Sequence, residues 1–171
     1  MRFLDELLSD FHRKMERENI LFSVHVYDSP AVLIRKGWIS QGKLLELIGD
    51  ALANAMHAIT RKPHREDEIV ELFMGFSKES GRYELDVYDS GEPFPDKILS
   101  QFGRRGLTTG GTGEGLANML ETLKKYRIRL MITEYSDEED MSKCLNFCFG
   151  ESFAVSYHGE RLGQFRLYCE K

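Results

Sequence analysis

The segment 44–61 constrains the fold most strongly, because its sequence predicts one long helix with two different faces. At about 100° per residue, apolar side chains gather on one face of this helix: Leu44, Ile48, Ala51, Leu52, Ala55, Ala58 and Ile59. The opposite face is polar and carries Glu46, Asp50, Asn54, His57 and Arg61. Ser40 stands just before the periodic run and is a suitable N-cap. The apolar face predicts packing on a core, whereas the polar face belongs either to solvent or to a functional site.

Length and charge limit the classes of protein that this chain can represent. A chain of 171 residues is sufficient for one domain with a sizeable core. The net charge of −5 and the lack of a dense Lys/Arg block predict that the chain binds neither nucleic acid nor an anionic membrane. No stretch approaches the roughly 18 apolar residues of a membrane span, and the first residues lack the pattern of a signal peptide. We therefore expect a cytoplasmic location.

The cysteines predict free thiols rather than a metal site. Cys144, Cys148 and Cys169 are an odd number, and the spacing of the first two is not that of a usual zinc site. Buried, reduced cysteines are the simpler interpretation in a reducing compartment.

Periodicity predicts further elements on both sides of the long helix. Apolar residues at helical spacing predict an amphipathic helix at 2–18, so we assign residues 1–19 to the end of an upstream helical module and 20–171 to the domain. Another amphipathic helix is expected from Leu116 to Tyr126. Strands are predicted at 20–27, 31–34, 69–76, 82–88, 128–135, 145–149, 153–157 and 164–169.

Two glycine-containing motifs stand next to predicted elements. Asp89-Ser90-Gly91 follows the strand 82–88 and places a carboxylate beside a turn that a flat ligand can approach, although the same residues also suit an ordinary Asx turn. The polar, glycine-rich segment 96–112 predicts a mobile loop. It leads into Gly111-Thr112-Gly113-Glu114-Gly115-Leu116, directly before a helix, where free N–H groups favour a phosphate. Because no strand precedes this motif, the sequence does not support a Rossmann dinucleotide site.

Three motifs occur in a fixed order: Asp50-x-x-x-Asn54 on a helix, Asp89-x-Gly91 after a strand, and Gly111-x-Gly113-x-Gly115 before a second helix. In this order they resemble the GHKL superfamily of ATP-binding domains, shared by DNA gyrase, heat-shock chaperones, mismatch-repair ATPases and sensor histidine kinases. From residue 20 onward the chain looks closest to the catalytic domain of a bacterial sensor histidine kinase, in particular the compact type of peptide-sensing kinases. The resemblance implies a two-layer α/β (α+β) sandwich of the Bergerat type. In such a fold about three helices pack on one face of a mixed β-sheet, and ATP lies under a flexible lid.

The resemblance implies roles for residues on the long helix and after the strand 82–88. Asn54 matches the asparagine that ligates Mg²⁺, a cation that takes hard oxygen ligands and few of them from protein. His57 takes the place of a basic side chain near the phosphates. Asp89 matches the aspartate that accepts the adenine amino group, and Gly91 matches the glycine that lets the base approach. Phe94 resembles an aromatic residue on the adenine side.

The remaining expected ATP contacts lie in the loop and at the start of the following helix. The residues that match the family's second glycine motif are Gly111, Thr112, Gly113, Gly115 and Leu116. Arg104 and Arg105 fall in the expected lid, where one of them, assigned as Arg105, contacts the γ-phosphate. The cofactors that the resemblance implies are ATP and Mg²⁺.

The chain departs from the kinase pattern at three places. Sensor kinases often lack a carboxylate four residues before the asparagine, whereas hydrolytic relatives and serine kinases place a general base there, so Asp50 can hold a water or hydroxyl beside the γ-phosphate. The usual Gly-Thr-x-Phe before the final strand is absent; Gly163-Gln164-Phe165 is the nearest approach, which leaves the adenine-contacting threonine unassigned. His12 lacks the acidic residue and proline that follow a phosphoacceptor histidine.

We therefore expect a catalytic domain that binds Mg²⁺–ATP and transfers the γ-phosphoryl group to a histidine on a separate upstream dimerisation domain, from which a response regulator receives it. Such a domain is cytoplasmic, also where it is part of a membrane-bound sensor. Two alternatives stay open. One is an ATPase or serine kinase in which Asp50 is the base, and the other is a regulatory module that binds nucleotide without catalysis. Asp50 and Asn54 are the candidate catalytic residues.

Overall fold

One mixed sheet organises the structure, a computed structural model that describes residues 2–100, 114–136, 139–159, 161 and 163–169. The helices are α1 (Arg2–Arg17), α2 (Ala31–Arg35), α3 (Gln41–Thr60), α4 (Asp96–Ser100) and α5 (Glu114–Tyr126). The strands are β1 (Ile20–Val26), β2 (Glu68–Phe76), β3 (Tyr83–Asp89), β4 (Ile128–Glu134), β5 (Lys143–Phe149), β6 (Ala154–Gly159) and β7 (Gly163–Cys169). They lie in the order β1-β2-β3-β5-β4-β6-β7. The pairs β1–β2 and β4–β6 are parallel, and the other neighbouring pairs are antiparallel.

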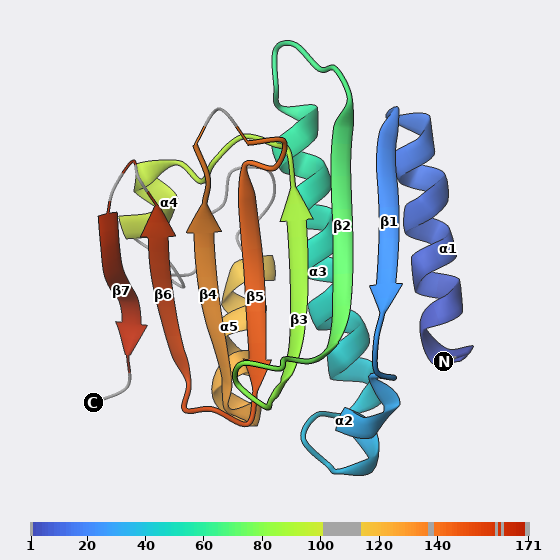
Figure 1. Cartoon of the computed structure of the whole chain (residues 1–171), viewed down its shortest axis with the longest axis vertical. Coiled ribbons are helices and arrows are strands. Elements are labelled where there is room, and N and C mark those ends of the chain that lie inside the picture. Colours follow the sequence, from blue (N-terminus) through green and yellow to red (C-terminus); the bar gives the residue numbers. More distant parts are fainter. Residues whose placement is uncertain (1, 101–113, 137–138, 160, 162, 170–171) are drawn as a thin grey trace.

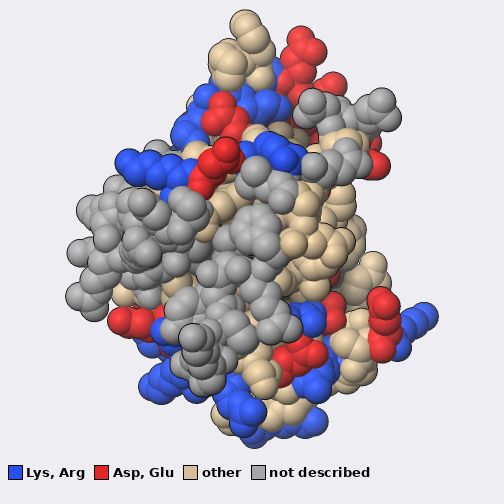
Figure 2. Space-filling view, turned by 90° about the vertical axis from the view of Figure 1, so that its left-hand side faces the viewer, with Lys and Arg blue, Asp and Glu red and all other residues tan. Residues whose placement is uncertain are grey.

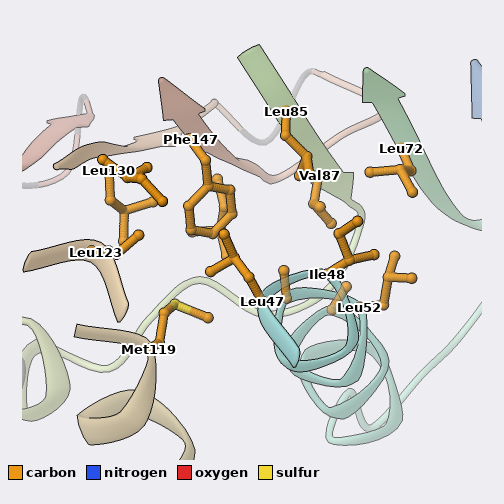
Figure 3. Packing of buried hydrophobic residues seen from close by; sticks show 14 of the residues in the cluster. Leu47, Ile48, Leu52, Leu72, Leu85, Val87, Met119, Leu123, Leu130 and Phe147 are labelled. Atoms are coloured by element: carbon orange, nitrogen blue, oxygen red, sulfur yellow. The ribbon is translucent and has the colours of Figure 1, made fainter. Parts of the chain in front are cut away.

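The helices form a second layer on one face of this sheet. In Figure 1, α3 and α5 lie behind the strands, and α1 stands beside β1 at the edge of the sheet. Between the layers, Leu47 and Ile48 of α3 point toward strand side chains such as Phe147 (Figure 3). Met119 and Leu123 of α5 extend the same core. The two-layer sandwich predicted from the sequence is therefore confirmed.

The central helix forms as its sequence predicts. The backbone N–H of Lys43 donates to Oγ of Ser40 over 3.3 Å, which is the expected N-cap. Every residue of the predicted apolar face is buried: Leu44, Ile48, Ala51, Leu52, Ala55, Ala58 and Ile59. Burial of each large aliphatic side chain contributes about 1.5–3 kcal/mol, so packing of this face fixes the rotation of α3 about its axis. That rotation turns the polar face away from the sheet.

The predicted strands are found within two residues of their expected ends, with one exception. Residues 31–34, predicted as a short strand, form helix α2 instead. Pro30 at its N-cap has a φ of −66°, and Oγ of Ser29 accepts from the N–H of Ala31 over 3.3 Å. A run of four apolar residues is too short for alternation to distinguish strand from helix, and these capping contacts favour the helix.

Helix α1 packs on the rest of the chain. Its apolar residues Leu4, Phe11 and Met15 are buried and belong to the same core as β1 and α3. The apolar face of α1 is thus covered within this chain, while the assignment of residues 1–19 to an upstream helical module stays a prediction. Among the described residues, no helix is both long and apolar enough to cross a membrane.

Candidate functional site

The end of α3 and the turn after β3 are joined by direct contacts. The backbone N–H of Glu92 donates to the carbonyl of Ala58 over 2.9 Å. Nε of Arg61, on the polar face of α3, lies 3.7 Å from a carboxylate oxygen of Glu92. The structure therefore brings together the two segments that carry Asn54 and Asp89, which are far apart in the sequence.

Gly91 is the residue that allows this approach. A Cβ atom at Gly91 would lie 2.6 Å from the carbonyl carbon of Ala58 and 2.7 Å from the backbone nitrogen of Ile59. Both are backbone atoms of α3 and cannot swing away, so only glycine fits without a shift of the helix. Its proposed second role, to admit a flat base, stays a prediction.

The polar face of α3 passes alongside this junction. Asn54 is partly exposed, one helical turn before Ala58, and His57 is exposed on the same side. Asp50 is half-buried one turn before Asn54. Burial, and to a smaller extent the negative charge of nearby Glu46, raise the pKa of Asp50 to about 6, while the positive charge of Lys43 acts in the opposite direction. A carboxyl group with a pKa near neutrality is a suitable general base.

Asp89 is held in a buried ion pair that the sequence analysis did not predict. Asp89 and Lys143 are each only 1% exposed, and Nζ of Lys143 donates to Oδ1 of Asp89 over 2.7 Å. The same oxygen accepts from the N–H of Gly91 over 2.9 Å. Lys143 also donates to the carbonyl of Glu92 over 2.9 Å and lies 5.4 Å from the ring centre of Phe94. Burial raises the pKa of Asp89, and the charge of Lys143 opposes this shift.

The adenine-contacting threonine stays unassigned, because the triplet 163–165 does not lie beside Asp89. Strand β5, not the final strand β7, pairs with β3, and its register places Lys143 opposite Asp89. The triplet 163–165 opens β7 at the far edge of the sheet. The sequence does contain a signal for the position of Lys143. Alternate residues of a strand point to the same face of the sheet, so Lys143 lies on the same face as Leu145 and Phe147, which face the core. A lysine on the core side of a strand needs a buried partner.

A second buried network fixes the segment that follows the turn. Glu134 accepts from the hydroxyl of Tyr157 over 2.7 Å and from the backbone N–H of Phe94 over 3.2 Å. Arg161 donates to Glu134 over 3.1 Å and to the carbonyl of Phe94 over 2.8 Å, and it also pairs with Asp96 at the start of α4. Phe94 itself is buried. The chain is thereby held in place from Asp89 to Asp96, a role of Glu134 and Arg161 that no local motif indicates.

The expected phosphate contacts can be located only in part. Arg104, Arg105, Gly111, Thr112 and Gly113 lie outside the described residues. Gly115 and Leu116 lie in the first turn of α5, which begins at Glu114. Figure 2 faces the edge of the sheet at which β7 and α4 lie, and there the described Lys and Arg side chains are interspersed with Asp and Glu. The described part of this surface thus presents no uniform basic patch.

Comparison with known proteins connects this fold to one class of domain. No family model matches the chain, and no curated protein matches it. The catalytic domain of the histidine kinase ThkA in a nucleotide-free form aligns with a TM-score of 0.64 at 15% identity, over 88% of this chain and 93% of that chain. The mycobacterial sensor histidine kinase MprB gives a TM-score of 0.62 at 18% identity, over 86% and 91% of the two chains.

A third similar structure is full-length ShkA in complex with AMPPNP. Its TM-score is 0.57 at 18% identity, and the match covers 85% of this chain but 29% of that one. At these identities the comparisons establish the fold alone. The chain has the fold of sensor histidine kinase catalytic domains, which confirms the α+β sandwich that the three motifs implied.

Proposed function

We propose that this chain is the catalytic domain of a sensor histidine kinase, which binds Mg²⁺–ATP beside α3 and the turn after Asp89. The observation that carries this proposal is the junction of α3 with that turn, within a fold shared with histidine kinase catalytic domains. It places the polar face with Asn54 and the carboxylate of Asp89 on adjoining segments. The nucleotide analogue in ShkA is consistent with this proposal.

The described side chains suit Mg²⁺ that is bound together with phosphate. Asn54 offers an amide oxygen on the partly exposed polar face of α3. Among the residues described, no group of three or more His, Cys, Asp or Glu side chains could hold a metal ion alone. Mg²⁺ usually takes one or two protein ligands and fills the other positions with phosphate oxygens and water. A site in which Asn54 is the protein ligand agrees with this usual coordination of Mg²⁺.

The base site fits adenine through the second oxygen of Asp89. Among the described residues, the donors that reach the carboxylate are Lys143 and Gly91, and both use Oδ1. In our proposal Oδ2 accepts from the adenine amino group, while Lys143 holds the carboxylate ionised and oriented. Since Asp89 is only 1% exposed, admission of the base requires the groups that cover this carboxylate to move.

Phosphoryl transfer then depends mainly on positioning and on neutralising charge. Mg²⁺–ATP, once bound, supplies the γ-phosphoryl group. In the transfer, the P–O bond to the β-phosphate breaks, a P–N bond forms on an imidazole of a separate dimerisation domain, and ADP departs. Asn54 would orient the metal and His57 would contact the phosphates, and Arg105, outside the described residues, stays the expected contact of the γ-phosphate. A response regulator is the expected acceptor of the phosphoryl group in the next step.

Two observations favour the alternative functions. The raised pKa of Asp50 suits a base that takes a proton from water or from a serine hydroxyl, as in an ATPase or a serine kinase. The buried pair of Asp89 and Lys143 suits a regulatory module that binds nucleotide without catalysis, because the pair holds this carboxylate in a fixed position whether or not transfer follows.

Calorimetric titration of ATP with and without Mg²⁺ tests the proposed site. We expect the wild type to bind, Asp89→Asn to weaken binding about ten-fold through loss of a charged acceptor, and Asn54→Ala to remove the dependence on Mg²⁺. Asp5→Asn on the exposed face of α1 is the matched control and should change nothing.

Transfer of labelled phosphate to a separate histidine-bearing helical hairpin domain tests the kinase step. Absence of ATP binding to the folded wild type would overturn the proposal. Binding without transfer would favour the regulatory module. Loss of hydrolysis in Asp50→Asn, with ATP affinity retained, would favour the ATPase.

A further inference from the structure

The sheet face opposite the helices carries a groove of about 510 Å³ that the proposed nucleotide site does not use. Figure 1 looks onto this face, in front of which no described helix lies. The groove runs over β2 and β3, where the outward side chains pair across the strands as Glu71 with Tyr88 and Phe73 with Asp86. Its volume is typical of a small-molecule site, for which about 300–1,000 Å³ is usual.

Aromatic rings line the groove in a continuous series. Tyr27 is 73% exposed and stacks on Phe73 with ring centres 6.4 Å apart and planes inclined by 11°. Phe73 meets the edge of Tyr88 at 5.6 Å, and Tyr88 stacks on Tyr135 at 6.4 Å. Gly75 leaves room for Tyr27, because a Cβ atom there would lie 2.9 Å from Cβ of Tyr27. Aromatic faces of this kind attract cations.

Two carboxylates of the groove, Glu84 and Asp86, accept hydrogen bonds from neutral side chains. Asp86 accepts from the side-chain amide of Asn146, and Glu84 accepts from that amide over 3.1 Å and from the hydroxyl of Ser80 over 2.8 Å. Burial raises the pKa of Asp86, and the nearby charge of Glu84 adds to this shift. A cation that entered the groove would relieve both effects.

None of the described Lys or Arg side chains neutralises Glu84 or Asp86. Within the described residues, the lining contains no Lys or Arg. Arg82, which lies on the same strand side near the end of the groove, pairs with Glu151 at 3.6 Å. His25 stacks on Phe73 with ring centres 4.4 Å apart. The groove therefore combines aromatic faces with two carboxylates, Glu84 and Asp86, that have no cationic partner among the described residues.

We propose that this groove binds a small, linear organic cation of the polyamine class. A metal ion is disfavoured, because no cluster of the described carboxylates could hold one. Glu84 and Asp86 are two residues apart on one strand, which separates their Cα atoms by about 7 Å, and both carboxylates converge on the same amide nitrogen of Asn146. One ammonium group can therefore lie against both carboxylates, while the methylenes that follow it lie on the rings of Phe73 and Tyr88.

Titration of spermidine into the whole chain at about 0.15 M salt tests the site. We expect saturable binding to the wild type and little binding of a neutral polyether of similar length. Tyr27→Ala, at an exposed position that should not affect folding, should weaken binding by between about two-fold and thirty-fold through loss of one ring face. Glu84→Gln combined with Asp86→Asn should weaken it about ten-fold or more.

The matched control is Asp5→Asn with Glu6→Gln, which removes the same charge from exposed positions on α1. This pair should leave the affinity unchanged. An equal loss in the control pair would show general charge attraction and would overturn the proposal. Absence of saturable binding to the wild type would overturn it as well, and so would binding of a lysine-rich peptide where spermidine fails to bind.

Discussion

Replacement of Lys143 by methionine removes one charge from a buried pair while it keeps a side chain of similar length against Phe94. At an effective dielectric constant of about 20, unit charges 2.7 Å apart attract by about 6 kcal/mol before desolvation is subtracted. Removal of one partner from a buried pair typically costs about 3–5 kcal/mol, because the other charge remains buried without compensation. We therefore expect Lys143→Met to lower the free energy of unfolding by this amount near pH 8.

The dependence on pH follows from Asp89. Burial already raises the pKa of this carboxyl group above its ordinary value, and loss of the ammonium group raises it further. At pH values between the pKa of Asp89 in the unfolded state and its higher pKa in the folded state, the folded state binds more protons than the unfolded state. The free energy of unfolding therefore falls as the pH rises through this range. The deficit of Lys143→Met should accordingly be largest at alkaline pH and should shrink as the pH falls and Asp89 takes up a proton.

Urea unfolding followed by circular dichroism measures these effects in wild type, Lys143→Met, Asp89→Asn and the double variant. The double variant should recover most of the loss, since it leaves no unpaired charge. A loss below about 1 kcal/mol in Lys143→Met would refute the reasoning, and so would a double variant that merely adds the two single losses. Either result would mean that the pair is not desolvated in solution.

Two further predictions concern α3. Asp50→Asn should raise the free energy of unfolding at pH 7 by about 1 kcal/mol after discount for partial exposure, because the pKa of Asp50 in the folded state, about 6, exceeds the ordinary 3.8. In the same unfolding assay the gain should vanish below about pH 4. An undiminished gain there would contradict the raised pKa of Asp50. Gly91→Ala should lower the free energy of unfolding by about 1–3 kcal/mol, because its Cβ atom clashes with the backbone of α3. Gly42→Ala has open space around it and should be neutral or stabilising in thermal unfolding. Equal effects of the two substitutions would argue against the close approach of Gly91 to α3.

The elements that the sequence predicted correctly are those with a long, regular pattern. The apolar face of α3 repeats over more than four turns, so its burial and the side on which Asn54 lies could be inferred without a structure. Strand β3 alternates over its full length, which located Asp89 at its end. The three motifs then identified the fold, because their order along the chain is more specific than any one of them.

The features that escaped prediction depend on which strands become neighbours. The pairing of β5 with β3 joins residues 54 positions apart, and only this register reveals Lys143 as the partner of Asp89. The contact of Arg161 with Phe94 depends in the same way on β4 and β6 being neighbours. Helix α2 was missed for a local reason, since capping at Ser29 and Pro30 outweighs the strand preference of a four-residue run.

These contacts give Asp89 two functions with opposite structural requirements, because one needs a buried carboxylate and the other an accessible one. As a structural group, Asp89 needs Lys143, and the buried pair ties β3 to β5 beside the turn that receives α3. As a base acceptor, it needs an open path to Oδ2, yet Asp89 is only 1% exposed. A nucleotide must therefore supply interactions that offset the movement of the groups that cover Asp89. Because removal of Lys143 harms stability in either case, affinity for ATP rather than stability distinguishes a lysine that orients Asp89 for the base from one that serves the fold alone.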